Sequence, residues 1–267
     1  MLTDEECRRC AEELLDAART GRPINPLAET FPGLTIADAY RIQRLWLEAR
    51  CAAGARAVGY KVGLTSQATQ ALFGAVEPMY GRILAQGVLA SGSRLRAAAF
   101  PRPRLEVELA FILGADISGS AVTPEQVLAA TERIVPAFEI VAQRTAASRL
   151  LADAIADNGA HGAVVLGSRG VAPGDADIAA ITATFYRNRE RIDSGAAASV
   201  LGHPAEAVAW LANTLDQSGE HLESGQIILT GTLTRAVEVI PGNLYRAEYH
   251  VPGARSDVFD ALEVSFG

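Results

Sequence analysis

The segment of residues 104–113 constrains the fold of this chain more than any other. Large apolar side chains occupy every second position from Leu105 to Leu113, and this spacing is typical of a β-strand. One face of this strand would begin with the carboxylates of Glu106 and Glu108, followed by Ala110 and Ile112. The opposite face would carry only large apolar side chains, namely Leu105, Val107, Leu109, Phe111 and Leu113.

Two carboxylates on one face of an otherwise apolar strand need an explanation. They repel each other and resist burial unless a positive group lies between them. A divalent cation with oxygen ligands meets that need, and a third carboxylate, Glu139, lies in a second apolar run at residues 134–141. We therefore hypothesise a metal site of Glu106, Glu108 and Glu139. The alternative is a solvent-exposed face of an antiparallel sheet.

Composition excludes several classes of function. The net charge of the 267-residue chain is -7, and no run of lysine or arginine suggests nucleic-acid binding. No apolar stretch reaches the length needed to cross a bilayer, and the first residues are acidic, unlike a signal peptide. Cys7 and Cys10 have the spacing of a C-x-x-C motif. The third cysteine is Cys51, so no second pair exists to complete a zinc site. We expect reduced thiols in a cytoplasmic protein.

The first 56 residues predict a helical region. Thr3 and Glu6 have capping-box spacing, and Thr35 begins a second helical pattern that stops near Gly54. From residue 57 to 267, strands and helices are interspersed without a strict βαβ rhythm. This order favours an α+β fold with a curled, mixed or antiparallel sheet and an N-terminal helical appendage.

Lys61 stands out because it lies in a short apolar strand between Gly59 and Gly63. Two interpretations are open. The side chain either buries its stem and extends its amine to solvent, or faces a pocket and meets an anion there.

Several short motifs occur in a fixed order along the chain. They are residues 59–66 (GYKVGLTS), 103–108 (PRLEVE), Glu139, 157–158 (DN), 201–204 (LGHP) and 225–231 (GQIILTG). Together they resemble the 2-keto-4-pentenoate hydratase and 4-oxalocrotonate decarboxylase family, which belongs to the fumarylacetoacetate hydrolase superfamily. The resemblance covers nearly the whole chain.

The resemblance implies a fold, a metal and a reaction class. It implies a roll-like β core of the fumarylacetoacetate hydrolase C-terminal type, with residues 57–267 as the metal-binding catalytic domain. It also implies Mg²⁺ or Mn²⁺ on Glu106, Glu108 and Glu139, and a homo-oligomer. Family members are lyases that act on 2-oxo-enoates and 2-hydroxydienoates of aromatic meta-cleavage pathways. Lys61 would be catalytic, holding the substrate carboxylate or stabilising an enolate.

The same motifs imply substrate contacts at Leu64, Thr65, Tyr80 and Thr230. Arg82 is a further candidate, for a second substrate carboxylate, although a surface arginine is the simpler interpretation. Where many relatives have a serine near residue 161, this chain has His161. His161 could replace a hydroxyl contact to substrate, or it could be a partly buried structural histidine.

Met79 separates two possible reactions. Hydratases of the family carry an acidic residue directly before the aromatic-glycine pair, whereas Met79 precedes Tyr80 and Gly81 here. The decarboxylase branch has an apolar residue at that position. Losing a carboxylate removes a candidate base for water and removes repulsion against a dianionic substrate.

We therefore expect decarboxylation of a 4-oxalocrotonate-like 2-oxo-enedioate, with hydration of a 2-keto-4-pentenoate as the alternative. Hydrolysis of an acylpyruvate is more distant, because no His-Glu pair is evident near the metal motif. An alternative of another class is a non-catalytic partner subunit in a complex of a hydratase and a decarboxylase. The intact Lys61 and glutamates argue against that alternative.

Overall fold

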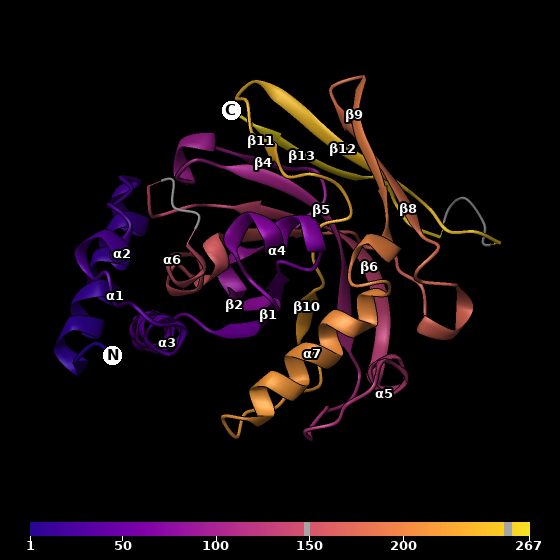
Figure 1. Ribbon diagram of the computed structural model, residues 1–267. Coiled ribbons are helices and arrows are strands. Elements are labelled where there is room, and N and C mark those ends of the chain that lie inside the picture. Colours follow the sequence, from indigo (N-terminus) through magenta and orange to yellow (C-terminus); the bar gives the residue numbers. More distant parts are fainter. Residues whose placement is uncertain (147–149, 254–257) are drawn as a thin grey trace.

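The computed structural model describes residues 1–146, 150–253 and 258–267, and two β-sheets with surrounding helices make up the molecule (Figure 1). The larger sheet has the strand order β2-β1-β10-β5-β6-β7-β3, and β11 also pairs with β5. β1 is parallel to β10 and β3 to β7, and the other ladders are antiparallel. The strands of this sheet are β1 (Ala57–Gly63), β2 (Met79–Leu84), β3 (Val88–Ala90), β5 (Arg104–Leu113), β6 (Thr131–Val141), β7 (His161–Leu166), β10 (Ile227–Leu229) and β11 (Val237–Glu238).

This sheet is curled into a roll. β2 and β3 are its two edge strands, yet only the 3₁₀ turn η1 (Ala85–Gly87) joins them in sequence. So short a connection requires the two edges to lie close together, and β2 also approaches β7. Within the described part of the chain, β2 and β3 form no ladder with each other, so the roll stays open.

Strand alternation gives the roll an inner and an outer face. On β5, Leu105, Val107 and Leu109 point outward into the main hydrophobic core. Glu106 and Glu108 have the opposite phase and point inward. The rest of the inner face carries a small apolar cluster of Ile83, Ala110, Val135, Ala137, Val164 and Leu229.

A second sheet packs against the outer face of the roll, with the order β4-β13-β12-β8-β9. Phe138 of the roll meets Phe185 of this sheet with ring centroids 5.6 Å apart. Helices α5 and α7 contribute to the same core, at the opposite end of the molecule from the second sheet (Figure 1). The elements are β4 (Ser93–Leu95), β8 (Thr182–Arg187), β9 (Glu190–Ala196), β12 (Asn243–His250), β13 (Leu262–Phe266), α5 (Pro124–Ala130) and α7 (Pro204–Asp216).

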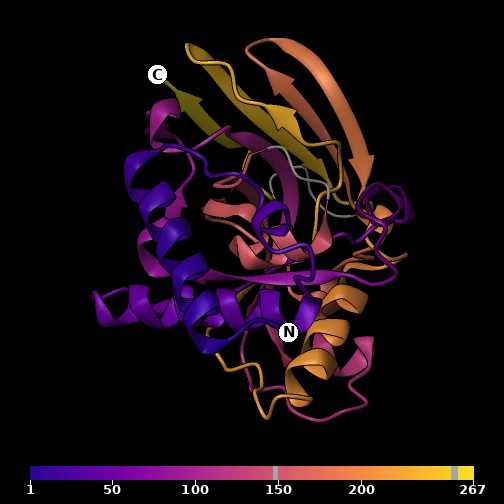
Figure 2. The same cartoon turned by 60° about the vertical axis from the view of Figure 1, so that its left-hand side comes forward.

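The N-terminal helices form a layer at one side of the roll (Figure 2). Thr3 and Thr35 cap α1 and α3 through capping boxes, and Gly21 ends α1 with φ of 70°. These helices share a hydrophobic cluster with α6 and with Leu64 and Met79 of the roll. The helices of this layer are α1 (Asp4–Thr20), α2 (Leu27–Thr30), α3 (Ile36–Ala52) and α6 (Leu151–Ala156).

The remaining elements are short. Ser66 caps α4, and the 3₁₀ turns lie between strands or beside helix ends. None of the described helices combines the length and hydropathy that spanning a membrane would require. These elements are α4 (Gln67–Phe73), η2 (Ala97–Ala99), η3 (Asn158–Ala160), η4 (Pro173–Asp175) and η5 (Ala197–Ser199).

Candidate metal centre and active site

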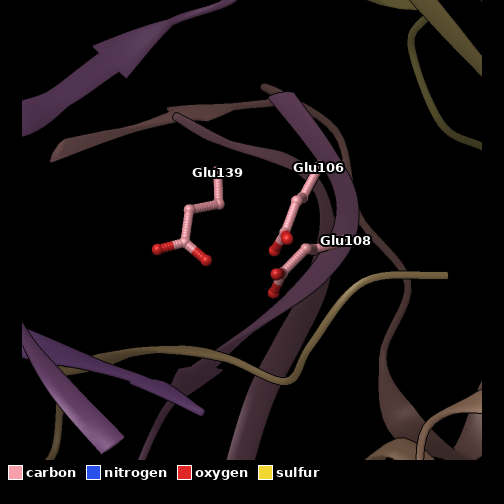
Figure 3. Close-up of side chains that lie close together, drawn as sticks. All are labelled: Glu106, Glu108 and Glu139. Atoms are coloured by element: carbon pink, nitrogen blue, oxygen red, sulfur yellow. The ribbon is translucent and has the colours of Figure 1, made fainter. Parts of the chain in front are cut away.

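Three glutamates meet inside the roll. Glu106 on β5 lies directly opposite Glu139 on β6 in an antiparallel ladder, and Glu108 follows two residues later on the same face of β5. One carboxylate oxygen of each lies within 4.8 Å of the others. Figure 3 shows the three side chains pointing into one common space. The local cause is strand alternation combined with the ladder register.

Burial opposes negative charge on this cluster. Glu108 and Glu139 are fully buried. Burial, with repulsion from Glu139, raises the pKa of Glu106 to about 7. Burial also raises the pKa of Glu108 well above its ordinary value, and Glu139 and Glu106 add to that shift. Without a positive ion, the two β5 carboxylates therefore tend to hold protons.

Glu139 behaves differently because it has two basic neighbours. Its Oε2 lies 3.3 Å from Lys61 Nζ, and its Oε1 lies 2.8 Å from His161 Nδ1. Burial favours the protonated form of Glu139, but Lys61 and His161 outweigh burial and lower its pKa. Burial likewise opposes the charge on Lys61, yet Glu139, Glu106 and Glu108 outweigh it and raise the pKa of the amine.

The carboxylate oxygens fit a hard divalent cation. Glu108 Oε1 is buried without a hydrogen-bond partner, and Glu139 Oε2 has only its ion pair with Lys61. Glu108 Oε2 accepts a hydrogen bond from the Gly231 amide at 2.8 Å. Buried polar atoms are rarely left unpaired in proteins, and oxygen ligands suit Mg²⁺, Mn²⁺ or Ca²⁺. The donor set therefore fits such an ion.

Lys61 is held rigidly beside the cluster. Its Nζ donates a hydrogen bond to the Gly159 carbonyl at 3.0 Å, and the residue is only 4% exposed. A Cβ at Gly159 would lie 3.0 Å from Lys61 Cδ, and a Cβ at Gly63 would lie 3.3 Å from Nζ. Both glycines thus leave room for the amine. The structure favours the pocket interpretation of Lys61 over an amine that extends to solvent.

Met79 forms an apolar wall next to Lys61. It pairs with Gly63 across the β1–β2 ladder, and its Cε lies 3.2 Å from the position that a Cβ on Gly63 would take. The same position is 3.3 Å from Lys61 Nζ. Met79 is buried, so its methyl group occupies space beside the amine.

Tyr80 and Arg82 lie on the other face of β2. The Tyr80 ring stacks on Tyr40 at 4.6 Å between centroids. Arg82 donates hydrogen bonds to the Tyr60 hydroxyl and to Glu220. The structure therefore does not bring these two residues to the carboxylates.

Leu64, Thr65 and Thr230 lie where the glutamate cluster meets the end of β10. Leu64 has φ of 58°, and Thr65 is buried against Gly231, where a Cβ would lie 2.0 Å from Thr65 Oγ1. Thr230 donates its hydroxyl to the Leu109 carbonyl at 3.1 Å. Through Gly231 this segment contacts Glu108, so it lies beside the glutamate cluster.

The family model for the fumarylacetoacetate (FAA) hydrolase C-terminal domain matches residues 64–258. This chain belongs to the fumarylacetoacetate hydrolase family. The predicted fold class and family resemblance are confirmed.

Relatives in the fumarylacetoacetate hydrolase family include lyases. The chain is 36% identical to 2-keto-4-pentenoate hydratase of Paraburkholderia xenovorans (strain LB400), over 96% of this chain and 94% of that protein. It is 39% identical to 2-oxo-hept-4-ene-1,7-dioate hydratase of Escherichia coli, over 92% and 95%. The solved structure of 4-oxalocrotonate decarboxylase from Pseudomonas putida G7, complexed with magnesium and adipate, has a TM-score of 0.94 and 29% identity, covering 100% and 99% of the two chains.

Sequence reasoning missed several groups that build this family site. It gave no role to the Gly159 carbonyl, the Gly231 amide or the contact between His161 and Glu139. One signal was available, because Gly231 directly follows an apolar strand and a glycine there often marks a close backbone approach. The pairing of His161 with Glu139 had no such signal, since it depends on the β6–β7 ladder. It corrects the expectation that no His-Glu pair lies near the metal motif.

Proposed function

We propose that this protein is a Mg²⁺-dependent lyase that decarboxylates a 2-oxo-enedioate such as 4-oxalocrotonate. The observation that carries the proposal is a buried cluster of three glutamates with unpaired oxygens, next to Lys61 and the apolar wall of Met79. Glu106, Glu108 and Glu139 would hold the ion. Residues 57–267 would form the catalytic domain, supported at one side by the helical region of residues 1–56.

The charged amine of Lys61 and the ionised carboxylate of Glu139 suit this role. When bound, a divalent cation withdraws electron density from the keto oxygen of a 2-oxo acid. Lys61, whose amine stays charged, attracts the substrate carboxylate or the oxygen that gains charge during reaction. Leu64, Thr65 and Thr230 would border the bound substrate on the Gly231 side. Tyr80 and Arg82 lie on the outer face of β2, so they would support the site through the strand that carries Met79 and not by contact with the bound substrate.

Decarboxylation needs little further from the protein. The bond between the terminal carboxylate carbon and the chain breaks, CO₂ leaves, and the electron pair moves into the conjugated 2-oxo system. A proton then completes the product. Met79 supplies no base for water and no negative charge against a dianionic substrate, which fits this path.

A second candidate is hydration of a 2-keto-4-pentenoate. The names of the two relatives quoted above favour it, because both are hydratases of 36% and 39% identity. In that reaction water adds to the far end of the conjugated chain and a base must orient the water. Met79 argues against hydration, because its side chain cannot act as that base.

We further propose that the protein forms a homo-oligomer and that it assembles with a paired hydratase or decarboxylase. Three free cysteines, two of them buried, fit the reducing conditions of the cytoplasm. Size-exclusion chromatography with light scattering measures the assembly directly. A monomer at all concentrations contradicts the homo-oligomer.

One assay separates the two reactions. The purified protein with Mg²⁺ is given 4-oxalocrotonate and, separately, enzymatically generated 2-hydroxypenta-2,4-dienoate, while CO₂ and dienoate absorbance are followed. CO₂ release that stops with a chelator supports the decarboxylase and the metal together. Loss of dienoate without CO₂ supports the hydratase. A protein that binds Mg²⁺ but turns over neither substrate contradicts both, and a non-catalytic partner subunit would then account for the intact site.

A further inference from the structure

A cavity separate from the glutamate cluster is lined by residues of α3, β2 and β7. It has a volume of about 240 Å³. Trp46 and Arg50 of α3, Arg82 of β2 and Arg144 after β6 line it, together with apolar side chains. Figure 1 shows α3 and β2 next to each other on this side of the molecule. We call this space the arginine cavity.

The arginine cavity is lined by cations without acids. Of the described residues that line it, none is Asp or Glu, whereas three are arginines. The buried Asp157 pairs with Arg144, and the half-exposed Glu220 pairs with Arg82, both from outside the lining. For Arg50 no ion pair is present within the described ranges. Arg50 is thus the cation that lacks a counter-ion.

The surroundings of Arg50 favour an added negative charge. Its guanidinium lies 5.4 Å from the centroid of the Trp46 ring, and that of Arg144 lies 5.5 Å from the same centroid. Two guanidinium groups on one indole lie close enough to repel each other. Burial and this repulsion from Arg144 lower the pKa of Arg50. An anion in the cavity would relieve the repulsion.

Two buried donors on the cavity lining have no acceptor. Trp46 is 4% exposed, and its Nε1 has no hydrogen-bond partner among the described residues. The same is true of Arg82 Nε, although Arg82 Nη1 is bonded to Tyr60 and Glu220. Leaving a buried donor unpaired costs free energy. A small oxyanion offers several acceptor oxygens and matches the planar fork of a guanidinium.

We propose that the arginine cavity is a binding site for one small oxyanion, a carboxylate or inorganic phosphate, held by Arg50, Trp46 and Arg82. The site is separate from the glutamate cluster, but His161 links them. His161 also lines the cavity, and its Nδ1 contacts Glu139. This inference does not depend on the proposed function, since anion binding is measurable in a protein without activity.

The test uses the full chain with Trp210→Phe. The sequence has two tryptophans, so this change leaves Trp46 as the sole indole reporter in the cavity wall. Trp46 fluorescence is followed while sodium phosphate or, separately, sodium acetate is added at constant ionic strength, with and without Mg²⁺. We expect a saturable change in emission. Saturation by phosphate alone, by acetate alone or by both identifies the oxyanion, and each supports the site.

Substitutions then locate the binding. Arg50→Gln removes the unpaired cation and is expected to weaken binding about tenfold or more, the loss expected for one hydrogen bond to a charged group. Arg50→Lys keeps the charge but loses the fork, and an intermediate affinity is expected. Arg22→Gln is the matched control, because Arg22 is exposed and does not line the cavity. No saturable change with either anion, or equal affinity in Arg50→Gln, overturns the proposal.

Discussion

At the scale of single residues, the pKa of Glu106 is raised and that of Glu139 is lowered, although the two face each other across one ladder. Glu139 is ionised because Lys61 and His161 stabilise its charge. At Glu106 and Glu108, burial and repulsion between the carboxylates outweigh the effect of Lys61, so their pKa values are raised. Glu139 is thus ionised without a metal, whereas Glu106 and Glu108 lose their protons fully only when a cation binds.

This difference predicts a pH dependence of metal binding. A metal ion must displace protons from Glu106 and Glu108, so Mg²⁺ affinity is expected to rise from about pH 6 to about pH 8, by up to about tenfold per unit for each proton displaced. Calorimetry in buffers of different ionisation enthalpy measures both the affinity and the protons released. Glu106→Gln should abolish activity and reduce the proton release while the fold survives. A Mg²⁺ affinity that does not change with pH contradicts the assignment.

The metal-free protein should show the opposite trend in stability. The folded pKa of Glu106 is about 7, above its ordinary value of 4.5. Between these values the folded state binds more protons than the unfolded state, so the free energy of unfolding falls as pH rises. The shifts of Glu139 and Lys61 act below and above this window, respectively. Urea unfolding at several pH values checks the sign, and Mg²⁺ should offset the loss.

His161 is expected to position a metal ligand through its contact with Glu139. His161→Ala should weaken Mg²⁺ binding about 10- to 100-fold, as is common when the group that orients a ligand is lost. His161→Asn keeps an amide donor and should restore part of the affinity. His250→Ala serves as an exposed control. If His161 instead only contacts substrate, KM will change while Mg²⁺ affinity does not.

Met79→Asp tests the choice of reaction. It places a carboxylate beside Lys61, which should raise hydration relative to CO₂ release and weaken binding of a dianionic substrate. Met79→Asn is the neutral control of similar size. The ratio of hydrated product to CO₂ is the measurement. An unchanged ratio in Met79→Asp counts against Met79 as the residue that selects the reaction.

At the scale of elements, local signals in the sequence are sufficient for several boundaries. Thr3 and Gly21 predict both ends of α1, and Thr123 with Pro124 predicts the start of α5. The alternation of residues 104–113 predicts β5 and the shared face of its glutamates. Each of these depends on neighbours within a few residues, so no tertiary information is needed.

Features that depend on distant parts of the chain could not be predicted in this way. The residue pattern and the family resemblance both grouped Glu139 with Glu106 and Glu108, but neither gave its position opposite Glu106, because a ladder register is not encoded in either strand alone. The outward orientation of Arg82 follows from the pairing of β2 with β1, which the sequence does not reveal. The two-sheet arrangement has the same origin.

A turn after β10 provides a prediction at this scale. Gly231 has φ of 110°, and its amide binds Glu108. Gly231→Ala should lower the melting temperature and the Mg²⁺ affinity, because its Cβ would clash with Thr65. Gly242→Ala is the control, since Gly242 has φ of 85° but no atom within 4 Å of its Cβ position. Equal losses in both variants would mean that backbone strain alone is responsible.

At the scale of the whole molecule, the helical layer and the roll share one hydrophobic cluster. Ile42 of α3 is fully buried in it, together with Met79 and Leu64 of the roll. The two parts should therefore unfold together despite their different architecture. We infer that packing of the helical region against β2 stabilises the position of Met79.

Ile42→Ala tests this coupling. It should lower the free energy of unfolding by about 2–5 kcal/mol, as a large-to-small change in a core does. The helical circular-dichroism signal and the tryptophan fluorescence, which comes from Trp46 in α3 and Trp210 in α7, should be lost in a single transition. Ile36→Ala is the control, because Ile36 is 41% exposed. Two separate transitions would instead show that residues 1–56 form an independent domain.

The opposite faces of β5 have a consequence for how this chain assembles. A slip of β5 by one residue against β6 would turn Glu106 and Glu108 toward the aromatic core and expose Leu105 and Val107 to the site. Such a misfolded intermediate would bury two carboxyl groups without hydrogen-bond partners and so would be strongly disfavoured. Glu106 and Glu108 therefore also favour the native register of β5 against β6 during folding.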